Sequence, residues 1–515
     1  MASSYLSPGV YMEEVSSGSK PIEAAGTAVA AFVGFAEKGP ANEPVLVTNW
    51  TQFTQTFGSF IPGSYLAHAV YGYFANGGGS GYVVRIGGED DQAAAQAPQA
   101  QLPAVGDEAK PAFTVRALAA PGSAPAAAAP ANLSVEVANV PDQPDDTFTL
   151  VVKRNGTPVE TFENLTTRRG ATNVVTAVRQ QSKLIAVEET SGKGLALPRK
   201  GAEVTLAPAA PADIDIAASD YVGDSADRTG FAGLEAIDEI TMLCVPDLMA
   251  AQARGLLDDE GVRAVQLAMI THCELMADRV AILDPPPALR AQQVKQWRAE
   301  ANYDSKYAAL YYPWIRVMDP LTGSPMFVPP CGHIAGIWAR NDSSRGVHKA
   351  PANEVVRGAI SLELNLTKGE HDQLNPDGIN CIRTFAGQGI RVWGARTLSS
   401  DPEWRYLNVR RLFNYIEKSI LNGTSWVVFE PNDHKLWDSV KRTITMFLRR
   451  VWRDGALFGQ IPAQAFFVKC DEENNPPENR DAGILTVEIG VAPVKPAEFV
   501  VFRISQFAEG AGLEE

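Results

Sequence analysis

Two apolar segments near the C-terminal end constrain the fold of this chain more than any other feature. Residues 485–491 (LTVEIGV) and 498–507 (EFVVFRISQF) each have the composition of a β-strand. Residues 4–15 form a matching extended segment near the other end, with Pro8-Gly9 in it and no helical period. A strand with an unpaired edge can pair with another chain. The two ends therefore predict ordered head-to-tail assembly.

Length, charge and composition limit the classes of protein. The 515 residues allow about three domains, and the hydrophobic content of 45% is typical of a globular protein. A formal net charge of −15 argues against a surface that neutralises nucleic-acid phosphates. No run of about 18 apolar residues occurs, and the first residues lack a basic segment followed by an apolar one. We expect no nucleic-acid partner, no direct membrane insertion, and a chain that is made and stays in the cytoplasm.

The cysteines indicate neither a disulfide framework nor a zinc site. They are odd in number, far apart and never in a C-x-x-C pair. We expect buried free thiols at Cys244, Cys273, Cys331, Cys381 and Cys470.

Strands and helices alternate in two separate parts of the chain. Residues 27–36 form a buried apolar run, residues 65–74 have one apolar helical face, and residues 82–86 read as a strand. The same pattern resumes with apolar runs at 240–246 and 280–284, joined by a helical stretch. The sequence thus predicts one α/β domain that is split by an insertion.

The segment between these parts differs in composition. Residues 92–131 are rich in alanine and proline, which predicts a flexible connection. Asn155-Gly156 separates two alternating segments and predicts a tight hairpin. We interpret the segment as a β-rich insertion.

Two amphipathic helices are predicted in the last third, over residues 409–420 and 436–451. They would cover one face of the terminal sheet. The second helix carries a basic face, opposite its apolar stripe, that consists of Lys441, Arg442, Arg449, Arg450 and Arg453. This face can bind an acidic partner or serve only as a solvated surface, and the sequence leaves both interpretations open.

These patterns predict a multidomain protein of the α+β or mixed α/β class. We expect an α/β core domain split by a β-rich insertion, a C-terminal sheet-and-helix domain and extended strand arms at both ends. We expect an N-terminal arm and linker over 1–26, a core domain over 27–88 and 231–375, an insertion over 89–230, a C-terminal domain over 376–495 and a C-terminal strand arm over 496–515.

No motif typical of catalysis, cofactor binding or metal binding is present. The glycines at 77–81 precede a strand and lack the Gly-Lys-Ser/Thr ending of a phosphate loop, so we interpret them as a helix end and a turn. Residues 191–194 (SGKG) are interpreted as a loop. Cys331 and His333 together offer too few ligands for a metal ion. We predict no catalytic residue and no cofactor.

Several segments together resemble the sheath proteins of contractile phage tails. The resemblance covers nearly all of the chain except residues 89–230. It is carried by residues 7–14, 27–60, 82–85, 311–314, 328–332, 387–398 (GQGIRVWGARTL), 429–433 (FEPND), 455–459 (GALFG) and 496–502 (PAEFVVF).

The resemblance implies a structural protein, not an enzyme. Its subunits would stack as helical rings around an inner tube above a baseplate, end at a terminator or cap, and contract to drive the tube through a target envelope. Both arms would donate strands to neighbouring subunits, with flexible connections at 16–19 and 493–496. The matching arm positions are Tyr5, Leu6, Val10, Tyr11, Val15, Phe499, Val500, Val501, Phe502 and Ile504.

We further hypothesise that the basic face binds acidic groups on the inner tube. The Ala-, Pro- and Arg-rich composition favours a bacterial phage-tail-like injection system, whose particle can be released from the cell. Two alternatives stay open. One is an oligomeric α/β enzyme such as a hydrolase, which predicts a cleft with a perturbed acid or nucleophile. The other is a baseplate or tube protein of the same apparatus.

Overall fold

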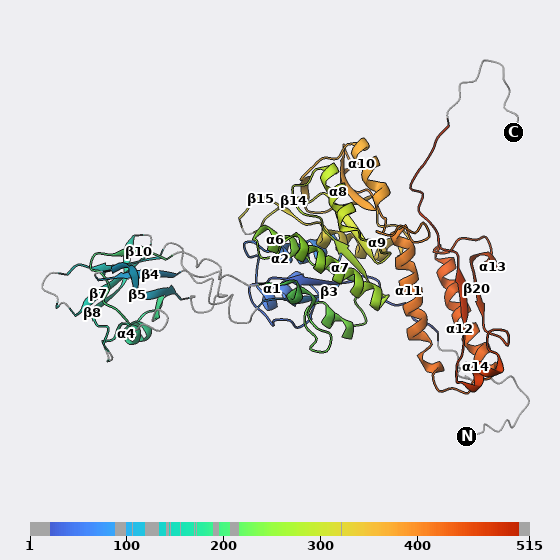
Figure 1. Ribbon diagram of the computed structural model, residues 1–515, viewed down its shortest axis with the longest axis horizontal. Coiled ribbons are helices and arrows are strands. Elements are labelled where there is room, and N and C mark those ends of the chain that lie inside the picture. Colours follow the sequence, from blue (N-terminus) through green and yellow to red (C-terminus); the bar gives the residue numbers. More distant parts are fainter. Residues whose placement is uncertain are drawn as a thin grey trace, which may run out of the picture.

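A nine-stranded sheet forms the centre of the molecule, and its strands come from two separate stretches of the chain (Figure 1). The computed structural model describes residues 21–87, 99–105, 107–118, 133–140, 144, 146–154, 156–168, 170, 172–188, 195–206, 216–320 and 322–503. The strand order is β16-β19-β18-β13-β12-β11-β1-β3-β2. The strands are β1 (Val29–Gly34), β2 (Val45–Val47), β3 (Ser80–Arg85), β11 (Met242–Cys244), β12 (Val280–Leu283), β13 (Ala308–Tyr312), β16 (Glu354–Val355), β18 (Ile379–Phe385) and β19 (Gly389–Val392).

The middle of this sheet is parallel. Strands β3, β1, β11, β12, β13 and β18 run parallel to one another, whereas β2 at one edge and β19 and β16 at the other join the sheet through antiparallel pairs. Parallel strands require crossover connections and coverage of both faces. The buried apolar runs predicted at 27–36, 240–246 and 280–284 supply three of the central strands, so these predictions are confirmed.

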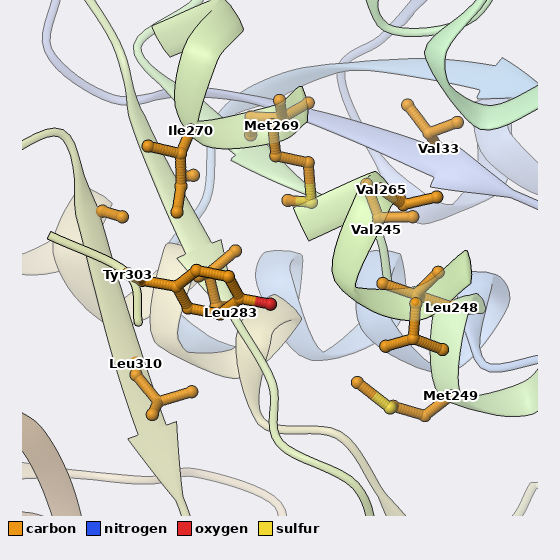
Figure 2. Packing of buried hydrophobic residues seen from close by; sticks show 14 of the residues in the cluster. Val33, Val245, Leu248, Met249, Val265, Met269, Ile270, Leu283, Tyr303 and Leu310 are labelled. Carbon is orange, nitrogen blue, oxygen red and sulfur yellow. The ribbon is translucent and has the colours of Figure 1, made fainter. Parts of the chain in front are cut away.

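Helices cover both faces of the sheet. On one face, α6 (Leu248–Ala253), α7 (Asp259–Met276) and α8 (Ala291–Ala301) pack in a cluster that includes Val33 of β1. Figure 2 shows Leu248, Val265 and Met269 from these helices together with Val33 of β1 as members of this cluster. On the other face, α1 (Trp50–Phe57), α2 (Leu66–Asn76) and α9 (Cys331–Arg345) cover Phe32 of β1. Alternate residues of one strand thus belong to two separate cores.

Glycines allow α2 and α9 to approach each other closely. A Cβ atom added to Gly332 would lie 2.3 Å from the carbonyl oxygen of Ala69, and one on Gly336 would lie 2.3 Å from that of Tyr73. The predicted end of α2 is confirmed, because Gly77 follows the helix with a φ of 115°. The same glycine run then leads into β3.

The remaining core elements lie around these layers. They are a three-stranded sheet with the order β15-β14-β17 and the helices α5 and α10. Their bounds are α5 (Ala218–Val222), β14 (Ile315–Met318), β15 (Pro325–Val328), β17 (Ala359–Leu362) and α10 (Lys368–Leu374).

The insertion has a hydrophobic core of its own. In Figure 1 it stands at one end of the molecule. Its two antiparallel sheets have the orders β4-β5-β9 and β10-β6-β7-β8. They consist of β4 (Gln99–Ala104), β5 (Asp107–Ala117), β6 (Leu133–Ala138), β7 (Phe148–Arg154), β8 (Thr157–Leu165), β9 (Ile185–Glu188) and β10 (Glu203–Thr205), joined by α4 (Val174–Gln181).

One prediction about the insertion is confirmed and one is wrong in part. Arg154 pairs with Thr157, so Asn155-Gly156 connects β7 and β8 as a tight hairpin. Residues 92–131 were expected to be a flexible connection, yet β4 and β5 lie within them. Alanine and proline do not prevent strands there, because Leu102, Phe113 and Val115 still supply buried apolar positions.

The C-terminal domain stands at the opposite end of the molecule from the insertion (Figure 1). It consists of α11 (Leu407–Gly423), α12 (His434–Arg453), α13 (Pro462–Ala465), β20 (Phe466–Lys469), α14 (Pro477–Asp481) and β21 (Glu488–Val491). The apolar faces of α11 and α12 share one hydrophobic cluster with β20 and β21. Both predicted helices are therefore confirmed, and α12 packs against β20 of the sheet, with α11 in the same hydrophobic cluster.

The overall fold class agrees with the sequence prediction, with one difference in extent. Strands β18 and β19 follow residue 375, where we expected the core domain to end, yet hydrogen bonding continues the core sheet as far as Val392. All five cysteines are buried free thiols, as predicted. No helix among the described residues has both the length and the apolar character needed to cross a membrane.

Candidate assembly site

The C-terminal domain contains a small sheet with two open edges. Strands β20 and β21 pair only with each other within the described part of the chain. An antiparallel pair directs every second N–H and C=O away from its partner strand. Two strands alone are marginally stable, and here α12 supports them from one face. Each outer edge can therefore accept one more strand.

The tail that follows this sheet is apolar and exposed. Phe499, Val500, Val501 and Phe502 are 68–84% exposed and take part in no helix or strand. We predicted a strand over 498–507, so the prediction is wrong for 498–503, the part that the structure describes. The physical reason is that a strand needs a partner, and the tail pairs with no described strand of its own chain. Four consecutive exposed apolar side chains indicate a surface that another molecule covers.

Glu498, the residue before this segment, is held by three side chains. Its Oε1 accepts hydrogen bonds from Asn375 Nδ2 at 2.8 Å and Arg396 Nε at 2.9 Å. Its Oε2 accepts from Arg396 Nη2 at 2.6 Å and from the Tyr406 hydroxyl at 3.2 Å. We call these four residues the tail clamp. Burial alone would raise the pKa of Glu498, but the hydrogen bonds from Arg396 and Asn375 outweigh it and hold the pKa below its ordinary value.

The first described residues of the chain, 21–27, lie against α11. Ile22 is buried against Gly423, and the Ala25 amide donates to Ser419 Oγ at 3.0 Å. Arg411 Nη2 then donates to the carbonyl oxygen of Thr27 at 3.0 Å. The root of the N-terminal arm is therefore fixed. The predicted arm residues Tyr5, Leu6, Val10, Tyr11 and Val15 lie outside the described residues, and so does Ile504 of the C-terminal arm.

The basic face of α12 is exposed along its length. Lys441, Arg442, Arg449, Arg450 and Arg453 all point away from the buried stripe of the helix, and none forms an ion pair with a described residue. Asp433 caps the helix by accepting a hydrogen bond from the Leu436 amide at 2.9 Å. Two of the arginines, Arg450 and Arg453, lie in the last turn, where positive charge is favourable.

The connection between α11 and the core is ionic. Arg411 pairs with Asp342, each side chain being 4% exposed, and its guanidinium lies 4.7 Å from the centre of the Trp338 ring. Lys418 pairs with Asp278 further along the helix. Removing one member of a buried pair leaves an uncompensated charge, so these contacts fix the orientation of α11 against the core.

Two buried carboxylates lie at the carboxyl ends of parallel strands, where α/β proteins commonly bind ligands. Asp247 accepts hydrogen bonds from the Phe35 amide at 2.6 Å, the Tyr65 amide and the Ser64 hydroxyl. Asp284 accepts from the Cys331 amide at 3.1 Å. Burial raises the pKa of Asp247 to about 6 and that of Asp284 to about 7. Both carboxylates lie at the N-terminal ends of helices, α2 and α9, where they accept hydrogen bonds from backbone amides.

Sequence reasoning missed the tail clamp. Glu498 was assigned to the strand arm, and Asn375, Arg396 and Tyr406 were not singled out. The one signal for it was a single carboxylate at the start of an apolar segment, which suggests a buried partner. Within the described residues, no group of three or more His, Cys, Asp or Glu residues is placed to hold a metal ion.

This mixed α/β architecture with an open C-terminal sheet matches one known class of protein. Two family models match consecutive stretches of the chain: the phage tail sheath protein central domain matches residues 232–398, and the phage tail sheath C-terminal domain matches residues 399–507. Together they cover more than half of the chain. The chain belongs to the phage tail sheath family.

Relatives with the same description occur in phages and in a bacterial genome. The tail sheath protein of Vibrio phage KVP40 is 29% identical over 218 residues, which are 42% of this chain and 32% of that protein. A prophage major tail sheath protein of Pseudomonas aeruginosa strain UCBPP-PA14 is 28% identical over 250 residues, which are 47% of this chain and 62% of that protein. The chain thus spans from about a third to just under two thirds of the length of these relatives.

Solved structures share the fold over nearly the whole chain. The anti-feeding prophage helical sheath in the contracted state is 24% identical, with a TM-score of 0.58 over 97% of this chain and 99% of that chain. The sheath complex of an extracellular contractile injection system, PVC, also in the contracted state, is 22% identical, with a TM-score of 0.58 over 99% of both chains. The likeness includes the insertion, which the family models leave out.

Proposed function

We propose that the chain is the structural sheath subunit of a contractile phage-tail-like injection system, which polymerises around an inner tube and contracts to drive it through a target envelope. The observation that carries this proposal is the exposed apolar segment Phe499–Phe502, found in the same chain as a two-stranded sheet with open edges. Membership in the sheath family supports it.

In this proposal each subunit donates both arms and accepts two. The N-terminal arm and the C-terminal tail would each add a strand to the β20–β21 sheet of a neighbour, because that sheet has two outer edges and is short of strands. Main-chain hydrogen bonds supply the tether, and the alternate side chains supply specificity. Contraction is then a rigid-body repacking of subunits that stay linked.

The same proposal gives each domain of the subunit, the baseplate and the terminator or cap a position in the polymer. Residues 89–230 would face outward and the part of the C-terminal domain from α11 to β21 inward, with the core domain, which includes β18 and β19, between them. The baseplate and the terminator or cap would contact the ends of the polymer. The energy for contraction would be stored at assembly in a metastable extended lattice, whose release is kinetic.

The first test is electron microscopy of the intact chain beside a chain without residues 1–15. We expect long hollow tubes of uniform width from the intact chain and none from the truncation. The truncation stops before Ile22, so it preserves the packing of that residue against Gly423. Small closed oligomers from both chains would contradict the proposal and favour the enzyme alternative.

The inner-tube contact is tested by reversing charge on α12. A chain with Arg449, Arg450 and Arg453 each changed to Glu is expected to form sheath but to bind the inner tube more weakly, by about 1–3 kcal/mol per subunit, because three exposed charge pairs are lost. Co-sedimentation with the tube protein measures the effect. The control reverses three exposed cations of the insertion, Arg154, Arg179 and Lys183, with the same change in net charge. Equal binding by both variants would assign the basic face to solvation.

A further inference from the structure

The tail clamp lies at the boundary between the fixed and the free parts of the chain. Up to Glu498 the chain is bonded to the body of the subunit, and from Phe499 onward the described side chains are exposed. Figure 1 shows the last described part of the chain rising clear of the C-terminal domain. The change from held to free takes place within one residue.

The clamp attaches the tail to the core, not to the C-terminal sheet that precedes it. Asn375 directly follows α10 in the connection to β18, Arg396 follows β19, and Tyr406 comes directly before α11. Although β21 belongs to the C-terminal domain, the chain therefore returns to the core domain, beside β18, before it leaves the subunit.

Arg396 is itself held rigidly by the core sheet. The Arg396 amide donates to Asn380 Oδ1 at 2.7 Å, and Asn380 Nδ2 donates to the Arg396 carbonyl at 2.8 Å. Asn380 is a fully buried residue of β18. A third contact, from Arg396 Nη1 to the carbonyl oxygen of Asn375 at 3.1 Å, orients the guanidinium toward Glu498. Charge-assisted bidentate pairs of this kind are strong and directional.

We propose that Glu498 is the positioning residue for strand donation: it fixes where the free strand begins and couples that strand directly to the core domain of its own subunit. This inference rests on the proposed function. The segment that was expected to be a flexible connection, 493–496, is not the free linker, because the Val494 amide donates to the Ala456 carbonyl and the Val494 carbonyl accepts from Asn408 Nδ2.

Losing the clamp would lengthen the free tail by a defined amount. The next anchor upstream is Val494, so release of Glu498 frees residues 495–498 as well. Four extended residues add up to about 13 Å of slack. They must also be ordered each time a strand is donated, which costs conformational entropy. A movement of the core domain would then be transmitted less directly to the donated strand. Neighbouring rings would be coupled less tightly as a result.

The test uses the full chain and measures the protein concentration at which tubes begin to form. The first variant, Glu498→Gln, removes the charge from the clamp. The second inserts Gly-Ser-Gly-Ser between Glu498 and Phe499, which leaves every clamp contact in place but adds the same four residues of slack. We expect both variants to require an about tenfold or higher concentration than the intact chain. Exposed Glu403 supplies the control, Glu403→Gln, which should leave the threshold unchanged.

Thermal unfolding separates positioning from simple stability. Glu498→Gln leaves the Arg396 charge partly unpaired, so the double variant Glu498→Gln/Arg396→Gln is measured as well. We expect the double variant to unfold at a temperature closer to that of the intact chain while its assembly threshold stays raised. The insertion variant should unfold like the intact chain.

The outcomes distinguish this inference from the proposed function. Tubes from the intact chain, together with an unchanged threshold for the insertion variant, would overturn the role of Glu498 and leave the sheath function standing. This holds even if Glu498→Gln fails to fold. Absence of tubes from the intact chain would instead overturn the sheath proposal. A raised threshold for the insertion variant at an unchanged unfolding temperature supports the inference.

Discussion

A chain that carries Val500→Pro and Phe502→Pro is expected to fold as a subunit and to form no tubes. Residues 500 and 502 lie on the same edge of an extended strand, and proline removes the N–H that each would donate to a neighbouring sheet. With ring clashes included, we expect each donated strand to lose about 3–5 kcal/mol of pairing free energy. That loss raises the assembly threshold by at least about a hundredfold. Pelleting assays and electron microscopy measure it.

Folding of this variant should be unaffected, because the side chains of Val500 and Phe502 are 68% and 84% exposed in the subunit. The control is Val500→Ile/Phe502→Tyr, which retains apolar, strand-forming residues and every N–H, and should still form tubes. A second pair, Phe499→Pro/Val501→Pro, tests the opposite edge. Normal tubes from both proline pairs would show that the tail is not donated as a strand.

The second large effect is expected for Gly332→Ala in α9. A Cβ atom at this position would lie 2.3 Å from the Ala69 carbonyl oxygen and 2.4 Å from its Cα, both of which belong to the backbone of α2. Neither atom can move without shifting a whole helix against the sheet. We expect the free energy of unfolding to fall by about 3 kcal/mol, at the upper end of the usual cost of overpacking. Denaturant unfolding of the unassembled subunit measures this change.

A matched control exists in α10. Gly369 is also the second residue of its helix, and a Cβ atom there would meet nothing within 4 Å. Gly369→Ala should therefore be neutral or stabilise the subunit by up to about 1 kcal/mol, because alanine is the better helix former. Equal unfolding free energies for the two variants would mean that α2 and α9 do not depend on close approach at Gly332.

Elements with a strong local pattern could be predicted from the sequence. The apolar run that forms β1, the amphipathic faces of α11 and α12, and the Asn155-Gly156 hairpin depend on residues close together in the chain, and the structure has each of them. The basic face of α12 follows from the same helical period. Helical periodicity places its five cations on one exposed side whatever the rest of the fold does.

Features that depend on distant residues could not be predicted in the same way. Glu498 meets its three partners, Asn375, Arg396 and Tyr406, across separations of 123, 102 and 92 residues. No periodicity links such positions. The absence of a strand over 498–503 has a related cause, because strand propensity is realised only where a partner edge is available. The extent of the core sheet beyond residue 375 likewise depends on which strand β18 meets.

The open edges of the β20–β21 sheet also bear on where such a polymer can stop. Suppose that each subunit offers two arms and presents two acceptor edges. Every arm then finds an edge, and every edge an arm, only in the interior of an assembly. At one end there are arms without acceptors, and at the other there are acceptors without arms. Growth then has no built-in stopping point, and the length of the polymer has to be set by other molecules that occupy its two chemically different ends.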